Sequence, residues 1–126
     1  MQIINDLKTR YSPVDFISVF SKWDNKQQIE LFGKKYGLLT KIIHDKQHKL
    51  ITHLAASKTP EAFLINNSKK IIYKGAINNQ YAAIGIRKAT EITCYLEDAI
   101  NDYLLNGVVR NPETNAVGCK IEPLKK

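Results

Sequence analysis

The candidate reactive groups of this chain are two cysteine thiols, Cys94 and Cys119. Cys119 follows Gly118 and precedes Lys120, a setting in which a partly exposed thiol with a lowered pKa could reach another group. The alternative is that Cys119 is a small buried hydrophobe in a terminal strand. Cys94 lies two residues beyond Ile92, where helix packing is the main prediction and a redox role the alternative.

Thr59 and Pro60 form a second candidate site. Pro60 opens the apolar run Ala62–Ile65, where its missing N–H removes no internal ladder bond. An X–Pro bond is also the one place where a fold can retain a cis peptide at small energetic cost. The alternative is that the turn only shapes the hairpin that follows.

Three histidines invite a metal interpretation that their spacing does not favour. His44 and His48 are four residues apart, but His44 is predicted to precede the helix, and the step of five to His53 places it on another face. No phosphate loop, nucleophile elbow or paired-carboxylate site occurs. The sequence therefore predicts neither a metal nor a cofactor.

The elements that must position these groups begin with an amphipathic helix over residues 2–11, which Ser12-Pro13 ends. Residues 14–20 predict a buried strand. Asp24 and Gln27 predict an N-cap with capping-box chemistry, and Gly37 closes the second helix. Residues 38–43 predict another strand, and Asp45 is the expected cap of a helix that turns Leu50 and Leu54 inward.

The second half predicts a hairpin, a loop and a helix. Ala62–Ile65 and residues 71–73 flank the polar turn 66–70. A loop of roughly a dozen residues follows Gly75. Residues 90–106 then predict a helix ended by Gly107. Its apolar stripe comprises Ile92, Leu96, Ala99, Ile100 and Tyr103. The alternation of strands and helices predicts a mostly parallel sheet with an antiparallel hairpin at its edge.

Bulk properties predict one globular domain over residues 1–126, with a C-terminal tail at 108–126. The chain is 44% hydrophobic and 25% charged. Nineteen basic residues against 12 acidic ones give a net charge of +7, but the lysines are scattered, so we expect no nucleic-acid partner. No run approaches a membrane span, and the N-terminus lacks signal-peptide features, which predicts a cytoplasmic chain as written.

Three stretches, taken in order, resemble a redoxin domain of the thioredoxin superfamily, of the peroxiredoxin-like type. They are residues 59–77, the helix and glycine stop at 95–107, and the Gly-Cys-x-Ile tail at 113–121. The resemblance covers residues 1–122. It implies a thioredoxin-like three-layer sandwich with a mostly parallel sheet and an antiparallel hairpin.

The resemblance also implies roles for single residues. The Thr59–Pro60 bond would be cis, and Lys58, Thr59 and Pro60 would bind an extended substrate segment by strand addition. Cys119 falls on the tail motif and is the candidate catalytic thiol. Asn78-Asn79 stands where acidic residues are common in the family, which puts any acid–base role there in doubt.

The chain departs from the family pattern at its start, because the first strand and the N-terminal cysteine motif are missing. One interpretation is an N-terminally truncated thiol–disulfide oxidoreductase or peroxiredoxin-like enzyme, acting on a thiol/disulfide protein or a peroxide. The other is a catalytically inactive thioredoxin-like binding module. A second copy could complete the sheet. An export signal in an upstream segment would place the protein outside the cytoplasm.

Overall fold

The computed structural model describes residues 2–37, 39–79, 81–83, 86–87 and 93–122. The chain divides into two compact units. One comprises Met1–Ala55 with Glu122–Lys126, and the other comprises Ala56–Ile121. The single domain expected over residues 1–126 stays a prediction.

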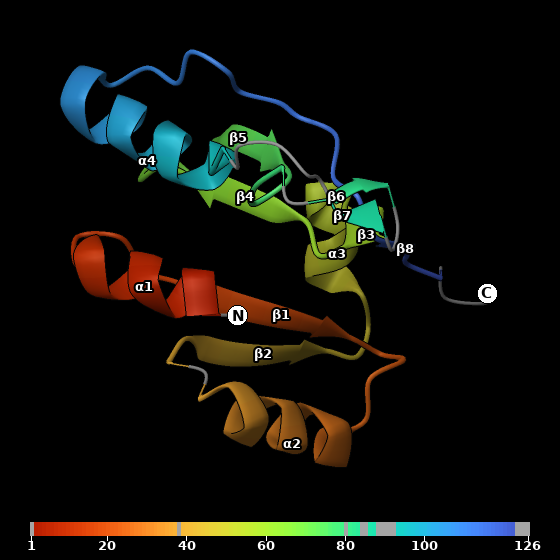
Figure 1. Cartoon of the computed structure of the whole chain (residues 1–126). Helices are drawn as coiled ribbons and strands as arrows, with labels where there is room; N and C mark the ends of the chain where they lie inside the picture. The colour runs from red at the N-terminus through yellow and green to blue at the C-terminus, as the bar shows by residue number, and fades with distance from the viewer. Residues whose placement is uncertain (1, 38, 80, 84–85, 88–92, 123–126) are drawn as a thin grey trace. The chain divides into compact units, whose positions relative to one another are not determined.

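The first unit is built on one βαβ crossover. Its elements are α1 (Gln2–Arg10), β1 (Ile17–Ser21), α2 (Lys26–Tyr36), β2 (Lys41–Asp45) and α3 (Lys49–Leu54). β1 and β2 pair in parallel, with Val19 opposite Ile43, and α2 connects them (Figure 1). α2 packs on this sheet through Phe32, whose ring meets Phe20 edge-to-face at a centroid distance of 5.6 Å.

Both ends of α2 have specific caps. The N-cap is Asn25, whose side chain accepts from the Gln28 amide at 2.8 Å while the Gln28 side chain accepts from the Asn25 amide at 3.2 Å. The predicted capping box at Asp24 was therefore wrong by one residue, since Asp24 instead accepts from the Ser21 amide at 3.2 Å. Gly37 ends the helix with a φ of 55°, as predicted.

Asp45 bonds the first amides of α3, as a cap does, but it is the last residue of β2, and the N-cap residue of the helix is His48. Its two carboxylate oxygens accept from the backbone amides of Lys49 at 3.0 Å and Ile51 at 2.9 Å. These amides have no partner within a helix, so a buried carboxylate is well placed to bond them. Leu50 and Leu54 of α3 are half-buried rather than fully inward.

The second unit contains a hairpin, a helix and two short ribbons. Its elements are β3 (Lys58–Thr59), β4 (Ala62–Ile65), β5 (Ile71–Gly75), β6 (Tyr81–Ala83), β7 (Ile86–Arg87), α4 (Tyr95–Asn106) and β8 (Cys119–Lys120). β4 and β5 form the predicted antiparallel hairpin. Its turn is held by the Asn66 side chain, which accepts from the amides of Ser68 and Lys70, each at 3.0 Å.

α4 supplies much of the buried surface of the second unit, and Figure 1 shows it beside β4. Leu96, Ala99 and Ile100 are buried as predicted, and Gly107 ends the helix with a φ of 71°. The helix begins at Tyr95, so Cys94 is its N-cap residue rather than an interior one. Ile92 and the predicted start at residue 90 lie outside the described residues.

The predicted thioredoxin-like three-layer sandwich is wrong. The described strands form four separate two-stranded sheets, of which β1–β2 is parallel and the other three are antiparallel. Parallel pairing needs a long crossover, and among these pairs the connection through α2 provides one. The short turn between β4 and β5 forces antiparallel pairing, and β4 pairs with no other described strand.

The predicted loop after Gly75 also needs correction. The chain forms the small antiparallel ribbon β6–β7 there, with Tyr81 opposite Arg87. Gly85, which the sequence places in that loop, lies outside the described residues.

None of the helices in the described ranges is both long and apolar enough to cross a bilayer.

Asp45→Ala is expected to destabilise the first unit by about 1–2 kcal/mol, because two helix amides lose their acceptor. Urea denaturation monitored by circular dichroism measures the change. Asp15→Ala, at an exposed position, is the matched control and should alter the midpoint little. Equal midpoints for the two variants would contradict the assigned cap.

Candidate functional site

The candidate site residues from the two ends of the second unit meet in the β3–β8 ribbon. The two strands pair antiparallel, with Thr59 opposite Cys119 and Lys58 opposite Lys120. The Thr59–Pro60 peptide bond is cis, as the resemblance predicted. The ribbon therefore places the candidate thiol directly across from the residue that precedes Pro60.

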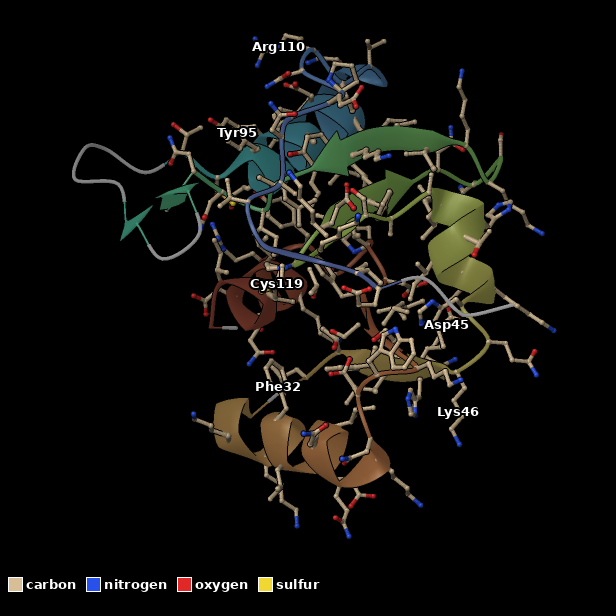
Figure 2. All side chains as sticks on the ribbon, turned by 90° about the vertical axis from the view of Figure 1, so that its right-hand side faces the viewer. Phe32, Asp45, Lys46, Tyr95, Arg110 and Cys119 are labelled. Atoms are coloured by element: carbon tan, nitrogen blue, oxygen red, sulfur yellow. The ribbon has the colours of Figure 1, made fainter. Side chains whose placement is uncertain are left out.

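Cys119 is exposed and free, and it lies on the extended C-terminal segment (Figure 2). The structure therefore contradicts the alternative that Cys119 is a small buried hydrophobe. Lys58, Thr59 and Pro60 are exposed as well. A solvent-borne partner can reach all four candidate residues.

Gly118 allows the two backbones of the ribbon to meet. A Cβ at this position would overlap the Thr59 carbonyl oxygen and would lie 3.1 Å from the Pro60 nitrogen. Any side chain here would push β8 away from β3. The glycine of the tail motif is thus a packing requirement at the Thr59–Pro60 peptide.

Two further bonds cross the ribbon, and a third lies within the segment that contains β3. The Ile121 amide donates to the Ser57 carbonyl at 2.9 Å, and the Lys58 ammonium donates to the Ala116 carbonyl at 3.1 Å. The Glu61 side chain accepts from the Ser57 amide at 2.9 Å, which shapes the approach to β3.

Upstream of the ribbon, the hydroxyls of the buried Tyr73 and the half-buried Thr114 anchor the C-terminal segment to the hairpin. The Tyr73 hydroxyl donates to the Ala76 carbonyl at 2.5 Å, and Thr114 Oγ1 lies 2.7 Å from it. Because the single Tyr73 proton is used, the Thr114 hydroxyl donates to Tyr73 and accepts from the Ala76 amide at 2.9 Å. Burial raises the pKa of Tyr73, and the Thr114 hydrogen bond opposes that rise.

The backbone reinforces this anchor. The Lys74 amide donates to the Pro112 carbonyl at 2.9 Å, and the Thr114 amide donates to the Lys74 carbonyl at 3.0 Å. Gly75 has a φ of 144°, and a Cβ there would overlap Thr114. The segment can therefore lie against β5 only because residue 75 is glycine.

An ion pair holds the start of the segment to α4. Arg110 donates to Asp102 from Nε at 3.1 Å and Nη2 at 2.9 Å, and the Arg110 amide donates to the same carboxylate at 3.1 Å. These hydrogen bonds from Arg110 lower the pKa of Asp102. Figure 2 shows Arg110 beyond the end of α4.

The remaining predicted residues lie away from the ribbon. Cys94 is half-buried, and its thiol donates to the Ile77 carbonyl at 3.5 Å. Asn79 exchanges hydrogen bonds with Thr93, its amide donating at 3.1 Å and its side chain accepting at 2.6 Å. Its role there is structural, because it holds the approach to α4.

Two of the three histidines, His44 and His48, bond backbone groups of one turn. His48 Nε2 accepts from the Lys22 amide at 3.1 Å, and His44 Nε2 lies 3.0 Å from the Ser21 carbonyl. No group of three metal-ligating side chains occurs in the ranges that the structure describes. In the first unit, these two rings hold the turn after β1.

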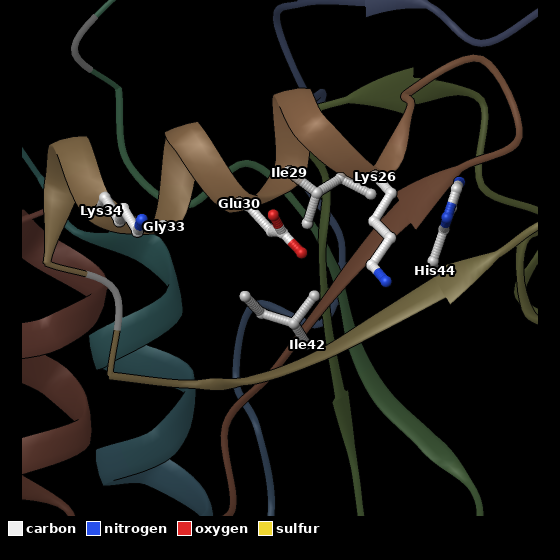
Figure 3. Close-up of a pocket in the computed structure, with 7 residues that line it drawn as sticks. All are labelled: Lys26, Ile29, Glu30, Gly33, Lys34, Ile42 and His44. Atoms are coloured by element: carbon white, nitrogen blue, oxygen red, sulfur yellow. The ribbon is translucent and has the colours of Figure 1, made fainter.

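The first unit also carries an open pocket of about 570 Å³ between α2 and β2 (Figure 3). Its lining residues are Lys26, Ile29, Glu30, Gly33, Lys34, Ile42 and His44. None of the predicted site residues lines it. Lys26, Glu30 and Lys34 follow one another at four-residue spacing along α2, so the glutamate lies between two lysines of opposite charge.

Sequence reasoning missed Thr114, Tyr73 and the Asp102–Arg110 pair. The signal that could have found the anchor is the pair of glycines at 75 and 118, each of which permits close backbone approach. Glycine alone does not identify its partner, so Thr114 could not be named from the sequence.

No protein-family model and no curated protein matches the chain. The solved structures that are similar to it include two at 18% sequence identity. One is a hypothetical protein from Sinorhizobium meliloti, with a TM-score of 0.76 over 95% of this chain and 66% of that one. The other is an uncharacterized conserved protein from Geobacillus kaustophilus, with a TM-score of 0.71 over 98% of this chain and 68% of that one.

These likenesses show the fold alone. The chain spans about two thirds of the length of both solved structures.

Thr114→Val should destabilise the second unit by about 1–3 kcal/mol, because the Ala76 amide loses its acceptor and Tyr73 its donor. Thr114→Ser keeps the hydroxyl and is the matched control, with a smaller loss expected. Chemical denaturation of both variants measures the difference. Similar destabilisation by the two would contradict the role assigned to the hydroxyl.

Asp102→Asn should destabilise the chain at pH 7, and the difference from the unmodified chain should vanish in acid. The folded-state pKa of Asp102 is lowered, so the ionised group stabilises the fold above its ordinary value of about 3.9. That contribution is lost as the pH falls through the folded-state value. Urea midpoints measured from pH 7 to pH 2 test this, and a constant difference would contradict it.

Proposed function

We propose that this chain acts in redoxin-type thiol–disulfide exchange, with Cys119 as the exchanging thiol and Lys58, Thr59 and Pro60 as the partner-binding edge. One observation carries the proposal: β8 places the exposed Cys119 directly opposite Thr59. The resemblance of residues 59–77, 95–107 and 113–121 to a redoxin domain supports the same chemistry.

The exchange step is a sulfur displacement. The Cys119 thiolate attacks one sulfur of a partner disulfide, the partner S–S bond breaks, and a mixed disulfide forms. The departing sulfur leaves as a thiolate and takes a proton from water. A second thiol, from the partner or from a small-molecule thiol, then attacks the mixed disulfide and releases Cys119.

Exposure favours Cys119 over Cys94 for this step. The Cys94 thiol is half-buried at the start of α4 and bonded to the Ile77 carbonyl. A disulfide must approach the attacking sulfur along the S–S axis, which an exposed strand residue allows.

A binding module is the second candidate function. It is favoured by the same ribbon, because an exposed strand of two residues can pair with an extended partner without any covalent step. In that case Cys119 would contribute shape to the edge and no exchange would be needed.

Exchange with a chromogenic aromatic disulfide should separate the two cysteines. The unmodified chain and Cys94→Ser should release one equivalent of coloured thiolate rapidly, and Cys119→Ser should lose that fast phase by about tenfold or more. Turnover of insulin disulfides or peroxide, with a dithiol as reductant, then distinguishes enzyme from binding module. Turnover unchanged in Cys119→Ser would overturn the role of Cys119, and no turnover in the unmodified chain would leave the binding module as the function.

A further inference from the structure

The backbone edge of β3 is occupied by another segment of the same chain. Strand β3 is the edge where a partner segment would pair, and in this structure the chain's own residues 117–121, here named the strap, lie on it. The strap shows directly what kind of backbone fits the edge. A partner segment that pairs with β3 on this side must displace the strap.

The strap is held less firmly than the segment that precedes it, although the Trp23 indole donates to the carbonyl of Glu122, the residue after the strap, at 2.7 Å. Ala116 is buried and Thr114 bonds the buried Tyr73, whereas Gly118 is half-buried and Cys119 and Lys120 are exposed. Regions with few buried contacts and exposed backbone bonds open at low free energy. The strap can therefore leave β3 while the anchor at Thr114 stays in place.

The register contains a mismatch that weakens the strap further. Lys58 and Lys120 are directly opposite each other in the antiparallel pair, and the Lys58 ammonium also donates to the Ala116 carbonyl at 3.1 Å. Like charges in this arrangement are destabilising, and an opposite charge at the same position is stabilising. An acidic residue at the position of Lys120 would fit the edge better than the chain's own lysine does.

Gly118 defines the second requirement. Its position against the Thr59 carbonyl leaves no space for a Cβ, so any segment that takes the same path needs glycine there. The position between the glycine and the residue opposite Lys58 lies opposite Thr59. In the strap this position is Cys119, which is exposed.

We propose that the β3 edge is a docking site for an extended segment of a partner protein with the pattern glycine–x–acidic, and that the strap is its built-in, weakly held competitor. In the proposed exchange reaction, x would be the partner's cysteine, which takes the place of Cys119 opposite Thr59 when the strap leaves the edge. The inference extends the proposed function by naming the segment that the partner presents, but strand pairing itself needs no thiol.

Binding is therefore measured in the full chain carrying Cys119→Ser, with fluorescein-labelled hexapeptides that contain serine in place of cysteine. The peptide Ala-Val-Gly-Ser-Glu-Ile should bind about threefold to tenfold more tightly than Ala-Val-Gly-Ser-Lys-Ile, from the sign of the cross-strand pair. Ala-Val-Ala-Ser-Glu-Ile should bind at least about tenfold more weakly than the first peptide, because its methyl group overlaps the Thr59 carbonyl. Fluorescence anisotropy reports each affinity.

Two strap variants should change the stability of strap pairing with β3 in opposite directions. Lys120→Glu should tighten the strap, slow hydrogen exchange of the Ile121 amide and weaken peptide binding by about threefold to tenfold. Gly118→Ala should loosen the strap and strengthen peptide binding. Lys70→Glu, at the exposed hairpin turn, makes the same charge change away from the edge and should alter binding little.

Equal binding of the glycine and alanine peptides, or no response to Lys120→Glu beyond that of Lys70→Glu, would overturn the proposal. Concentration-dependent dimers in the absence of peptide would also overturn it, by assigning the edge to a second copy of the chain. Because every arm lacks Cys119, these results are independent of whether thiol exchange occurs.

Discussion

Close backbone contact at two glycines is the constraint on which the candidate site depends. Gly75 lies against Thr114, and Gly118 lies against the Thr59–Pro60 peptide. Between them, residues 112–121 run from β5 to β3 and bring a distant part of the chain beside the Pro60 turn. A side chain at either glycine would separate those backbones, and Cys119 would no longer lie opposite Thr59.

The two contacts differ in strength, and that difference bears on function. The first is buried and completed by the Tyr73, Thr114 and Ala76 hydrogen bonds, which leave each hydroxyl satisfied. The second is exposed, spans a strand of two residues and sets one lysine against another. A firm anchor followed by a weak strand keeps the thiol near Pro60, and a partner gains the edge only by displacing that strand.

Local features of this fold were predictable from the sequence, and long-range ones were not. The Ala62–Ile65 hairpin, the glycine stops at 37 and 107 and the Asp45 cap each depend on a few neighbouring residues with strong preferences. The capping box was displaced to Asn25 because two adjacent polar residues can both cap, and only packing selects one. The return of residues 112–121 has no local signal, since two-residue strands carry no periodicity. The prediction of a three-layer sandwich was wrong for a related reason. Strand order depends on long-range pairings that sequence patterns do not encode.

The pairing of β8 with β3 can be observed directly by nuclear magnetic resonance. The Ile121 amide bonds the Ser57 carbonyl, so by alternation the next pair, Lys58 and Lys120, is the non-hydrogen-bonded one, in which the Cα atoms approach to about 4.5 Å. A strong nuclear Overhauser effect between the Hα atoms of Lys58 and Lys120 in the full chain is the predicted result. Absence of that cross-peak, with an Ile121 amide that exchanges as fast as in an unstructured peptide, would contradict the account.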